Sequence, residues 1–324
     1  MNRKSMRIVF FGTPEFASAQ LENLIKNNFN IVGVVTAPDK KAGRGKTLSS
    51  SPVKKVANEF AIPLLQPESL KNETFITELK NLGADLFIVI AFRMLPEVVW
   101  TLPPLGTINL HASLLPQYRG AAPINRAIMN GESETGLTTF FINSKIDHGN
   151  IILQKKLKIG TEENFGELHD RMIEDSKGMI LQTIEKIATG EINLIDQNDF
   201  ISTDTKLNAA PKIFKTDCVI DWTGSGVSIY NHIRGLSPYP GAIATFFSST
   251  GKEIELKLFQ SRFEPDISSD GSLTLLTDNK TFLKVALEDG FIFLEMLQQA
   301  GKKVLKANIF LQGFNFEGFW QAKP

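Results

Sequence analysis

Residues 109–120 read Asn-Leu-His-Ala-Ser-Leu-Leu-Pro-Gln-Tyr-Arg-Gly, and the stretch begins inside a short apolar strand predicted at 107–111. Asn109 and His111 lie two positions apart, so on a strand their side chains project from the same face. An amide N–H at that place can hold a developing oxyanion while the imidazole moves a proton. The turn that follows is made rigid by proline and glycine, and acyl transfer depends on such fixed geometry. The stretch therefore indicates an acyl-transfer site at the end of a strand.

Short apolar segments alternate with helical ones through the first half of the chain. We expect strands at 7–12, 31–35, 86–91 and 107–111, and helices near 14–26, 52–60 and 68–82. This alternation predicts an α/β fold with a doubly wound, mostly parallel, Rossmann-like sheet. Ligands of such sheets collect at the carboxyl ends of the strands, where Gly12, Phe92 and the Asn109–His111 pair would lie. Gly12 is a single glycine where a dinucleotide fingerprint needs three, which disfavours hydride chemistry on NAD.

The pattern changes in the second half of the chain. A long helix is expected near residues 165–188, and the next twenty or so residues are rich in Asn, Asp and Thr with little periodicity, as in a linker. Beyond it we expect a helix at 225–234 and short strands at 253–258, 272–276, 282–287 and 291–297. These strands lie between turn signals and indicate a small antiparallel barrel or sandwich. The predicted domains are 1–189, a linker at 190–207, and 208–324.

The composition excludes several classes of protein. The chain has 324 residues with 35 Lys and Arg against 35 Asp and Glu, so only local basic patches could hold a nucleic acid. The one cysteine, Cys218, excludes an intrachain disulfide and a cysteine-rich zinc site. No segment reads as a signal-peptide core or approaches the roughly 20 apolar residues of a membrane helix. We therefore expect a cytoplasmic protein.

A third polar group follows at Asp147, in the stretch Lys-Ile-Asp-His-Gly at 145–149. The order Asn-x-His, then Ser-Leu-Leu-Pro-x-Tyr-Arg-Gly, then an Asp-x-Gly loop resembles the signature of the folate-dependent formyltransferases. The resemblance implies that a formyl group passes from 10-formyltetrahydrofolate to an amine, without a metal. It also implies the roles: Asn109 donates to the oxyanion, His111 shuttles the proton and assists the oxyanion, and Asp147 orients the imidazole or relays protons.

The resemblance also implies a folate-binding surface. The family seats the pterin where the chain leaves the strand at 86–91, and the turn after the Asn-x-His pair contributes as well. The implied residues are Phe92, Arg93, Met94, Leu95, Ser113, Leu114, Leu115 and Pro116. Many members carry Tyr-Gly in place of Phe92-Arg93. A pocket that binds the pterin through backbone groups tolerates this difference in side chains.

Two basic segments point to RNA. Residues 37–46 and 51–55 together hold six basic residues against one acid. The first segment resembles the inserted loop with which the tRNA-acting members of the family engage the acceptor end. It implies contacts by Arg44 and, to phosphates, by Lys40, Lys41 and Lys46. The stretches Gln-Gln-Ala-Gly-Lys-Lys at 298–303 and Leu-Gln-Gly at 311–313 are similar to the tail of those members, whose OB-like barrel helps to hold the tRNA. That similarity implies contacts by Lys302, Lys303 and Lys306.

The resemblance covers nearly the whole chain and implies formylation of the α-amine of initiator methionyl-tRNA by a protein that we expect to be monomeric. The alternative is a sugar-nucleotide formyltransferase, which shares the core but should not need the Arg44 loop or a basic tail. A non-catalytic RNA-binding protein is disfavoured because Asn109, His111 and Asp147 are all present. A formyltransferase of free nucleotides in purine synthesis would need only the first domain.

Overall fold

The structure is a computed structural model that describes residues 5–42, 47–202 and 206–323. The chain folds into two compact units, each assembled from segments that alternate along the sequence. Unit 1 comprises Met1–Gly120, Thr135–Leu157 and His169–Ala209, and unit 2 comprises Ala121–Glu134, Lys158–Leu168 and Ala210–Pro324. The predicted division into a catalytic domain, a linker and a tRNA-binding domain used consecutive ranges, and it stays a prediction about what each part does.

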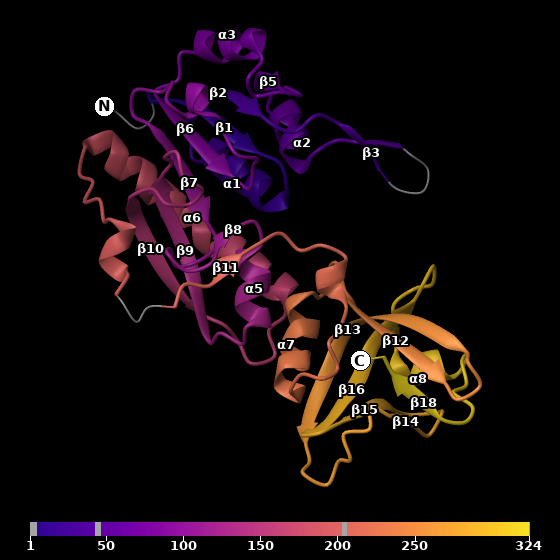
Figure 1. The fold of residues 1–324 in the computed structure, drawn as a ribbon. Helices are drawn as coiled ribbons and strands as arrows, with labels where there is room; N and C mark the ends of the chain where they lie inside the picture. Colours follow the sequence, from indigo (N-terminus) through magenta and orange to yellow (C-terminus); the bar gives the residue numbers. More distant parts are fainter. Residues whose placement is uncertain (1–4, 43–46, 203–205, 324) are drawn as a thin grey trace. The chain divides into compact units, whose positions relative to one another are not determined.

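A seven-stranded sheet forms the centre of unit 1 (Figure 1). Its strands, in spatial order, are β10 (Ile151–Lys158), β9 (Glu134–Phe141), β7 (Thr107–His111), β6 (Leu86–Ile90), β1 (Arg7–Gly12), β2 (Asn30–Val35) and β5 (Leu64–Leu65). The five strands from β7 to β5 pair in parallel, and β9 pairs antiparallel with β7. The predicted α/β, mostly parallel sheet is confirmed.

Helices cover both faces of this sheet, because successive residues of the central strands β1 and β6 are apolar and buried, so that both faces are apolar. The helices of unit 1 are α1 (Glu15–Lys26), α2 (Pro52–Glu59), α3 (Glu73–Asn81), α4 (Glu97–Trp100) and most of α6 (Phe165–Thr189). On one face, Val9 and Phe11 pack with Phe75 of α3. The helix expected at 68–82 begins later, because the Asn72 side chain accepts the Phe75 N–H at 3.0 Å and so caps it.

The order of the parallel strands reverses between β1 and β6. The strands β2 and β5 follow on one side of β1, whereas β6 and β7 lie on the other side. The carboxyl ends of β1, β6 and β7 are therefore neighbours, at Gly12, Ile90 and His111. Open α/β sheets bind ligands at such a switch point. The fold therefore supports the sequence-based prediction that ligands bind at the carboxyl ends of these strands.

Unit 2 is built on an antiparallel sheet that nearly closes into a barrel. Its strands are β12 (Ala242–Ser248), β13 (Glu253–Pro265), β14 (Leu275–Thr277), β15 (Leu283–Leu287), β16 (Gly290–Gln299), β17 (Leu305–Lys306) and β18 (Trp320–Ala322). The two edges meet where Thr274 bridges Gln321 and the Ala322 N–H donates to Leu273 O at 2.9 Å. The predicted smaller barrel is confirmed, although β12 and β18 were not expected from the sequence.

Three helices accompany the barrel of unit 2: α5 (Pro123–Met129), α7 (Gly226–Gly235) and α8 (Ala307–Leu311). The helices α5 and α7 pack on each other, and α8 packs against β16 and β17. The predicted helix at 225–234 is α7, whose N-terminus is set by Ser225: its hydroxyl accepts the Ser228 N–H at 3.2 Å. The Asn125 side chain of α5 donates to Gly235 O at 2.8 Å, which ties the two helices together.

The remaining elements are short. A hairpin of β3 (Lys40–Ala42) and β4 (Thr47–Ser49) extends away from the sheet of unit 1 (Figure 1). The strands β8 (Arg119–Gly120) and β11 (Ala209–Ala210) pair, and single turns of 3₁₀ helix form at Gln197–Phe200 and Thr216–Cys218. Among the helices of the described ranges, none has the length and apolarity needed to cross a membrane.

Candidate active site

Asn109 carries a carboxamide near the carboxyl end of β7. Its backbone is held in the middle of the sheet, since Asn109 pairs with Val89 of β6 and Phe140 of β9. The side chain is half-buried, and it makes no hydrogen bond to any residue in the part of the chain that the structure describes. The strand thus fixes the backbone from which the carboxamide projects, and among the described residues nothing competes for its N–H donors.

His111 lies two residues further along the same strand, with only 7% of its surface exposed. Its Nε2 lies 2.8 Å from the carbonyl oxygen of Tyr118, which can only accept. This contact assigns the proton to Nε2 in the neutral ring and leaves the Nδ1 lone pair unprotonated. Nδ1 lies 3.9 Å from Oδ2 of Asp147. The ring can therefore take up a proton at Nδ1 and hold it beside a carboxylate.

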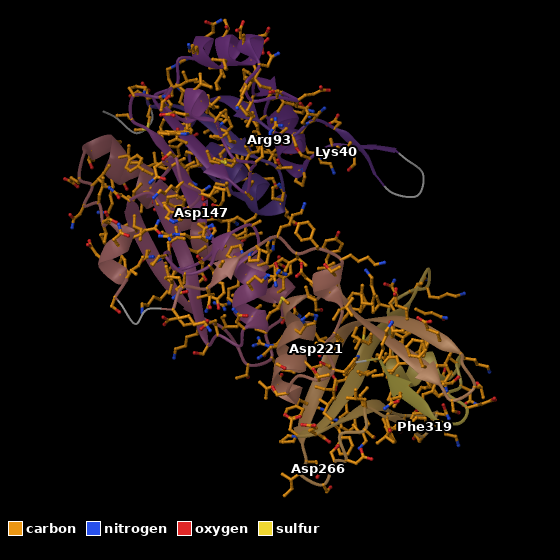
Figure 2. The ribbon with its side chains drawn as sticks, in the orientation of Figure 1. Lys40, Arg93, Asp147, Asp221, Asp266 and Phe319 are labelled. Carbon is orange, nitrogen blue, oxygen red and sulfur yellow. The ribbon has the colours of Figure 1, made fainter. Side chains whose placement is uncertain are left out.

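Asp147, labelled in Figure 2, lies in the loop between β9 and β10, and its carboxylate faces the His111 ring. Its Oδ2 accepts the backbone N–H of Gly120 at 2.9 Å, and its own backbone has a φ of 56°. Two residues later the chain passes so close to the sheet that a Cβ at Gly149 would lie 1.5 Å from Phe141 O. The Asp-x-Gly pattern is explained by this close approach, which only glycine permits.

Arg119 and His148 support the same loop. The Arg119 guanidinium donates from Nε to Asp147 O at 3.1 Å and from Nη1 to His148 Nε2 at 2.9 Å. The other His148 nitrogen lies 2.6 Å from Ile146 O. Burial lowers the pKa of Arg119, and the charge of Asp147 acts in the opposite direction. Arg119 thus pins the loop that carries Asp147, and both histidine nitrogens of His148 are used within it.

Gln197 is a site residue that the sequence analysis missed. It lies in the stretch predicted as a linker, yet it is only 1% exposed. Its Oε1 accepts from Arg119, and its Nε2 donates to the backbone of the Asp147 loop. A weak signal was available: Ile195, just before it, is an apolar residue that bridges Ile151 of β10.

The turn at 113–116 is closed by its own hydrogen bonds. The Ser113 hydroxyl donates to Gln117 O at 2.6 Å, and the Thr138 hydroxyl donates to Ser113 O at 2.7 Å. Ser113 is fully buried, and Leu115 and Pro116 are buried as well, whereas Leu114 is partly exposed. The polar groups of this turn are therefore engaged in fixing the chain after His111.

The segment after β6 presents a mixed surface. Leu95 is buried with Phe92 packed beside it, and the Phe92 ring lies 5.8 Å from that of Phe11 on β1. Met94 is 65% exposed. The Arg93 guanidinium donates from Nη1 to Glu68 O at 2.7 Å and from Nη2 to Pro67 O, and burial lowers its pKa (Figure 2). Arg93 thereby anchors this segment to the 67–68 chain.

The predicted RNA-contacting residues fall in both units. In unit 1, Lys40 is exposed on β3 and Lys41 follows it on the same strand, whereas Arg44 and Lys46 lie outside the described residues. At the base of this hairpin, the Lys54 ammonium hydrogen-bonds Asp39 at 2.6 Å and lowers the pKa of that carboxyl.

In unit 2, Lys302 and Lys303 are exposed between β16 and β17, and Lys306 is exposed at the end of β17. The turn that carries them is closed by Gln298, whose Nε2 donates to Lys302 O at 2.7 Å. No group of three or more His, Cys, Asp or Glu suited to a metal ion occurs among the residues described.

Comparison with known proteins matches both parts of the chain to one family. Residues 6–184 match the model of the formyl transferase family, and residues 212–315 match that of the formyl transferase C-terminal domain. The chain is 46% identical over 323 residues to a methionyl-tRNA formyltransferase of Bacteroides fragilis, with 100% of this chain and 99% of the relative covered. It is 47% identical to that of Parabacteroides distasonis, with 97% of each chain covered.

Among solved structures, the chain resembles WlaRD, a sugar 3N-formyltransferase determined with dTDP and 5-N-formyl-THF. The TM-score is 0.63 at 19% identity, and the match covers 92% of this chain and 99% of WlaRD. At that identity the likeness shows the fold alone.

Proposed function

Because the chain belongs to the methionyl-tRNA formyltransferases, we propose that Asn109, His111 and Asp147 are the groups with which it performs formyl transfer. The reaction is formylation of initiator methionyl-tRNA, with a folate derivative as the formyl donor. The observation that carries the assignment of residues is their arrangement: a carboxamide without a partner among the described residues shares one strand face with a buried imidazole, and a carboxylate lies 3.9 Å from Nδ1.

Asn109 stabilises the oxyanion. When the α-amine of the methionyl group attacks the formyl carbon, negative charge develops on the formyl oxygen. The Asn109 backbone is held in β7, and the side-chain amide has no hydrogen bond to break among the described residues. Such a preorganised donor acts on the transition state more than on the ground state, which is what raises kcat.

His111 moves the proton. An α-amine has a pKa of about 8 in solution, so part of it is already neutral at cellular pH and this part needs little help from a base. The attacking nitrogen must still lose a proton, and the departing N10 of the folate must gain one. His111 can accept at Nδ1 and return the proton from there, since its Nε2–H is occupied by Tyr118 O.

Asp147 holds the protonated imidazole in place. Its Oδ2 faces Nδ1 across 3.9 Å, a separation that leaves electrostatic attraction but no direct hydrogen bond. The Gly120 N–H keeps this oxygen oriented. Asp147 therefore favours the imidazolium during transfer, either directly or through one water molecule.

The folate is proposed to bind at the carboxyl ends of β1 and β6. Phe92 and Met94 supply apolar surface there, and backbone groups of 92–95 can read the polar edge of a pterin. Ser113, Leu115 and Pro116 are buried, so we assign the 113–116 turn to shaping the wall of the pocket.

Replacing Arg93 by alanine is expected to raise KM for 10-formyltetrahydrofolate about tenfold and leave kcat within about twofold. The variant loses the hydrogen bonds from Arg93 to the 67–68 carbonyls, each worth about 1.5 kcal/mol for a charged donor. Steady-state kinetics with the donor varied measures this effect. Arg7→Ala is the matched control, because Arg7 also donates to two backbone carbonyls, at the opposite end of β1. An unchanged KM in Arg93→Ala, or an equal rise in Arg7→Ala, would contradict the assignment.

The basic residues are proposed to hold the tRNA. Lys40, Lys41, Arg44 and Lys46 would contact the acceptor end, and Lys302 and Lys303 the phosphates of the RNA. Exposure of Lys40, Lys302 and Lys303 supports this assignment. We further propose that the protein acts as a monomer in the cytoplasm.

The test of the activity offers three acceptors to the purified protein with labelled 10-formyltetrahydrofolate at one fixed salt concentration. They are charged initiator methionyl-tRNA, charged elongator methionyl-tRNA and an amino-sugar nucleotide. We expect rapid formylation of the initiator alone. Formylation of the sugar alone would retain the roles of Asn109, His111 and Asp147 but refute those of the basic residues. Absence of transfer to all three would refute the function.

A further inference from the structure

Gln197 uses its whole side-chain amide at the base of the Asp147 loop. Its Oε1 accepts from Arg119 Nη2 at 2.6 Å and from Arg119 Nε at 3.0 Å. Its Nε2 donates to Asp147 O at 2.9 Å and to Gly149 O at 2.8 Å. Both donor hydrogens and both acceptor lone pairs of the amide are thus engaged, in a side chain that is only 1% exposed.

The two partners of Gln197 are the two segments that set the position of the Asp147 carboxylate. Arg119 directly precedes Gly120, whose N–H binds Asp147 Oδ2. The loop itself holds Asp147 at a positive φ, a conformation that aspartate tolerates better than most residues but that still costs free energy. The Gln197 amide lies fifty residues from Asp147 in the sequence. It therefore links the segment that carries Arg119 and Gly120 to the loop that carries Asp147.

Among the described residues, the Asp147 carboxylate has one hydrogen bond, from the Gly120 N–H, and it faces the His111 imidazole and the Arg119 charge, so its placement depends on the backbones of 119–120 and of its own loop. A displacement of about 1 Å in a catalytic group can cost on the order of 10²-fold in rate. We propose that Gln197 is a positioning residue, which acts on formyl transfer by holding the Asp147 carboxylate opposite His111. This inference rests on the proposed role of Asp147.

Two substitutions distinguish the role of the Gln197 acceptor oxygen from that of its N–H donors. Gln197→Met keeps the length of the side chain but removes all of its hydrogen bonds. Gln197→Glu keeps an acceptor for Arg119, and so the buried anchor, but sets an oxygen against the carbonyls of Asp147 and Gly149. Asn198→Ala is the matched control, because Asn198 is the next residue, is exposed, and makes no side-chain hydrogen bond to the described residues.

We expect both Gln197 variants to lower kcat by about 10- to 100-fold, with KM for the donor and for the tRNA within about threefold of wild type. Asn198→Ala should match wild type. A Gln197→Glu variant with wild-type kcat would overturn the inference, because Gln197 would then serve only to anchor Arg119. A variant whose Tm falls while kcat at low temperature is retained would overturn it as well, since its role would be structural.

The closing experiment places Gln197→Glu in an Asp147→Ala background and compares kcat in all four proteins. If Gln197 acts through Asp147, the Gln197 substitution should have less than a threefold effect once the carboxylate is gone. An undiminished effect in that background would overturn the inference while leaving the role of Asp147 intact. A wild-type kcat in Asp147→Ala alone would refute the proposed role of Asp147, and the inference with it.

Discussion

Replacing His111 by alanine should lower kcat for formylation of initiator methionyl-tRNA by about 10²- to 10⁴-fold, the range that a positioned acid–base group contributes. The His111 ring is the imidazole that shares a strand face with Asn109, and its Nδ1 faces Asp147. Its removal leaves the departing nitrogen of the folate without a proton donor in the site. Single-turnover formylation with saturating donor and tRNA reports this step directly, because product release does not contribute.

The same substitution also removes the hydrogen bond from Nε2 to Tyr118 O, which contributes about 1 kcal/mol to stability. The fraction of folded protein must therefore be measured in parallel. His169→Ala is a suitable control, because His169 lies on α6, where its ring contacts Phe16, and has no proposed part in the chemistry. If His111→Ala retained a rate within about threefold of His169→Ala, the proton-transfer role of His111 would be wrong.

Replacing Asn109 by alanine should lower kcat by about 10²- to 10³-fold, the effect of losing one oxyanion donor. Because the carboxamide makes no hydrogen bond to the described residues, its loss leaves no buried group unpaired within them. We therefore expect the Tm to stay within about 2 °C of wild type, since a change below about 0.5 kcal/mol shifts Tm by no more than that in a chain of this size. The combination of a large kinetic effect and a small thermal effect is the signature of a group reserved for the transition state.

The variant Asn109→Asp provides the matched comparison for this prediction. It has the same shape, but it replaces the N–H donors with a carboxylate that repels an oxyanion, so its rate should be no higher than that of Asn109→Ala. A rate for Asn109→Asp close to wild type would show that Asn109 is a space-filling residue rather than a donor.

The elements that the sequence predicted well are those whose signals are local. The strand at 107–111 was expected with its correct bounds, because its apolar run ends at a polar residue and a turn. The alternating pattern at 253–258 likewise identified β13, where one face is buried and the other is exposed. In both cases neighbouring residues determine the structure, so periodicity alone is sufficient.

The elements that the sequence did not predict depend on distant contacts. The strand β12 lacks alternation because residues on both of its faces are buried. The strand β18 is three residues long and forms by pairing with β12 and by bridging Thr274, both far away in the sequence. The division of the chain between the two units was not predicted either. Residues 121–134 lie between two segments of unit 1 in the sequence, and nothing in their pattern indicates that they pack in unit 2.

The same distinction applies to the site. Motif spacing indicated Asn109, His111 and Asp147, but not how the last of them reaches the first two across the intervening strands. That depends on the Gly120 N–H and on Arg119, which belong to the signature although it does not show their contacts, and on Gln197, which lies outside the signature. A glutamine in a polar stretch resembles a linker residue until the fold brings it against the loop.

The most direct test of the account is the single-turnover rate of formyl transfer by the double variant Asn109→Ala/His111→Ala, with binding of donor and tRNA measured separately. If the two residues form one catalytic unit, both substrates should bind with near wild-type affinity. The loss of rate should then be smaller than the product of the two single losses, because each single substitution already disables the shared step. Transfer by the double variant within a few-fold of the wild-type rate would contradict the claim that the Asn109–His111 pair carries the chemistry.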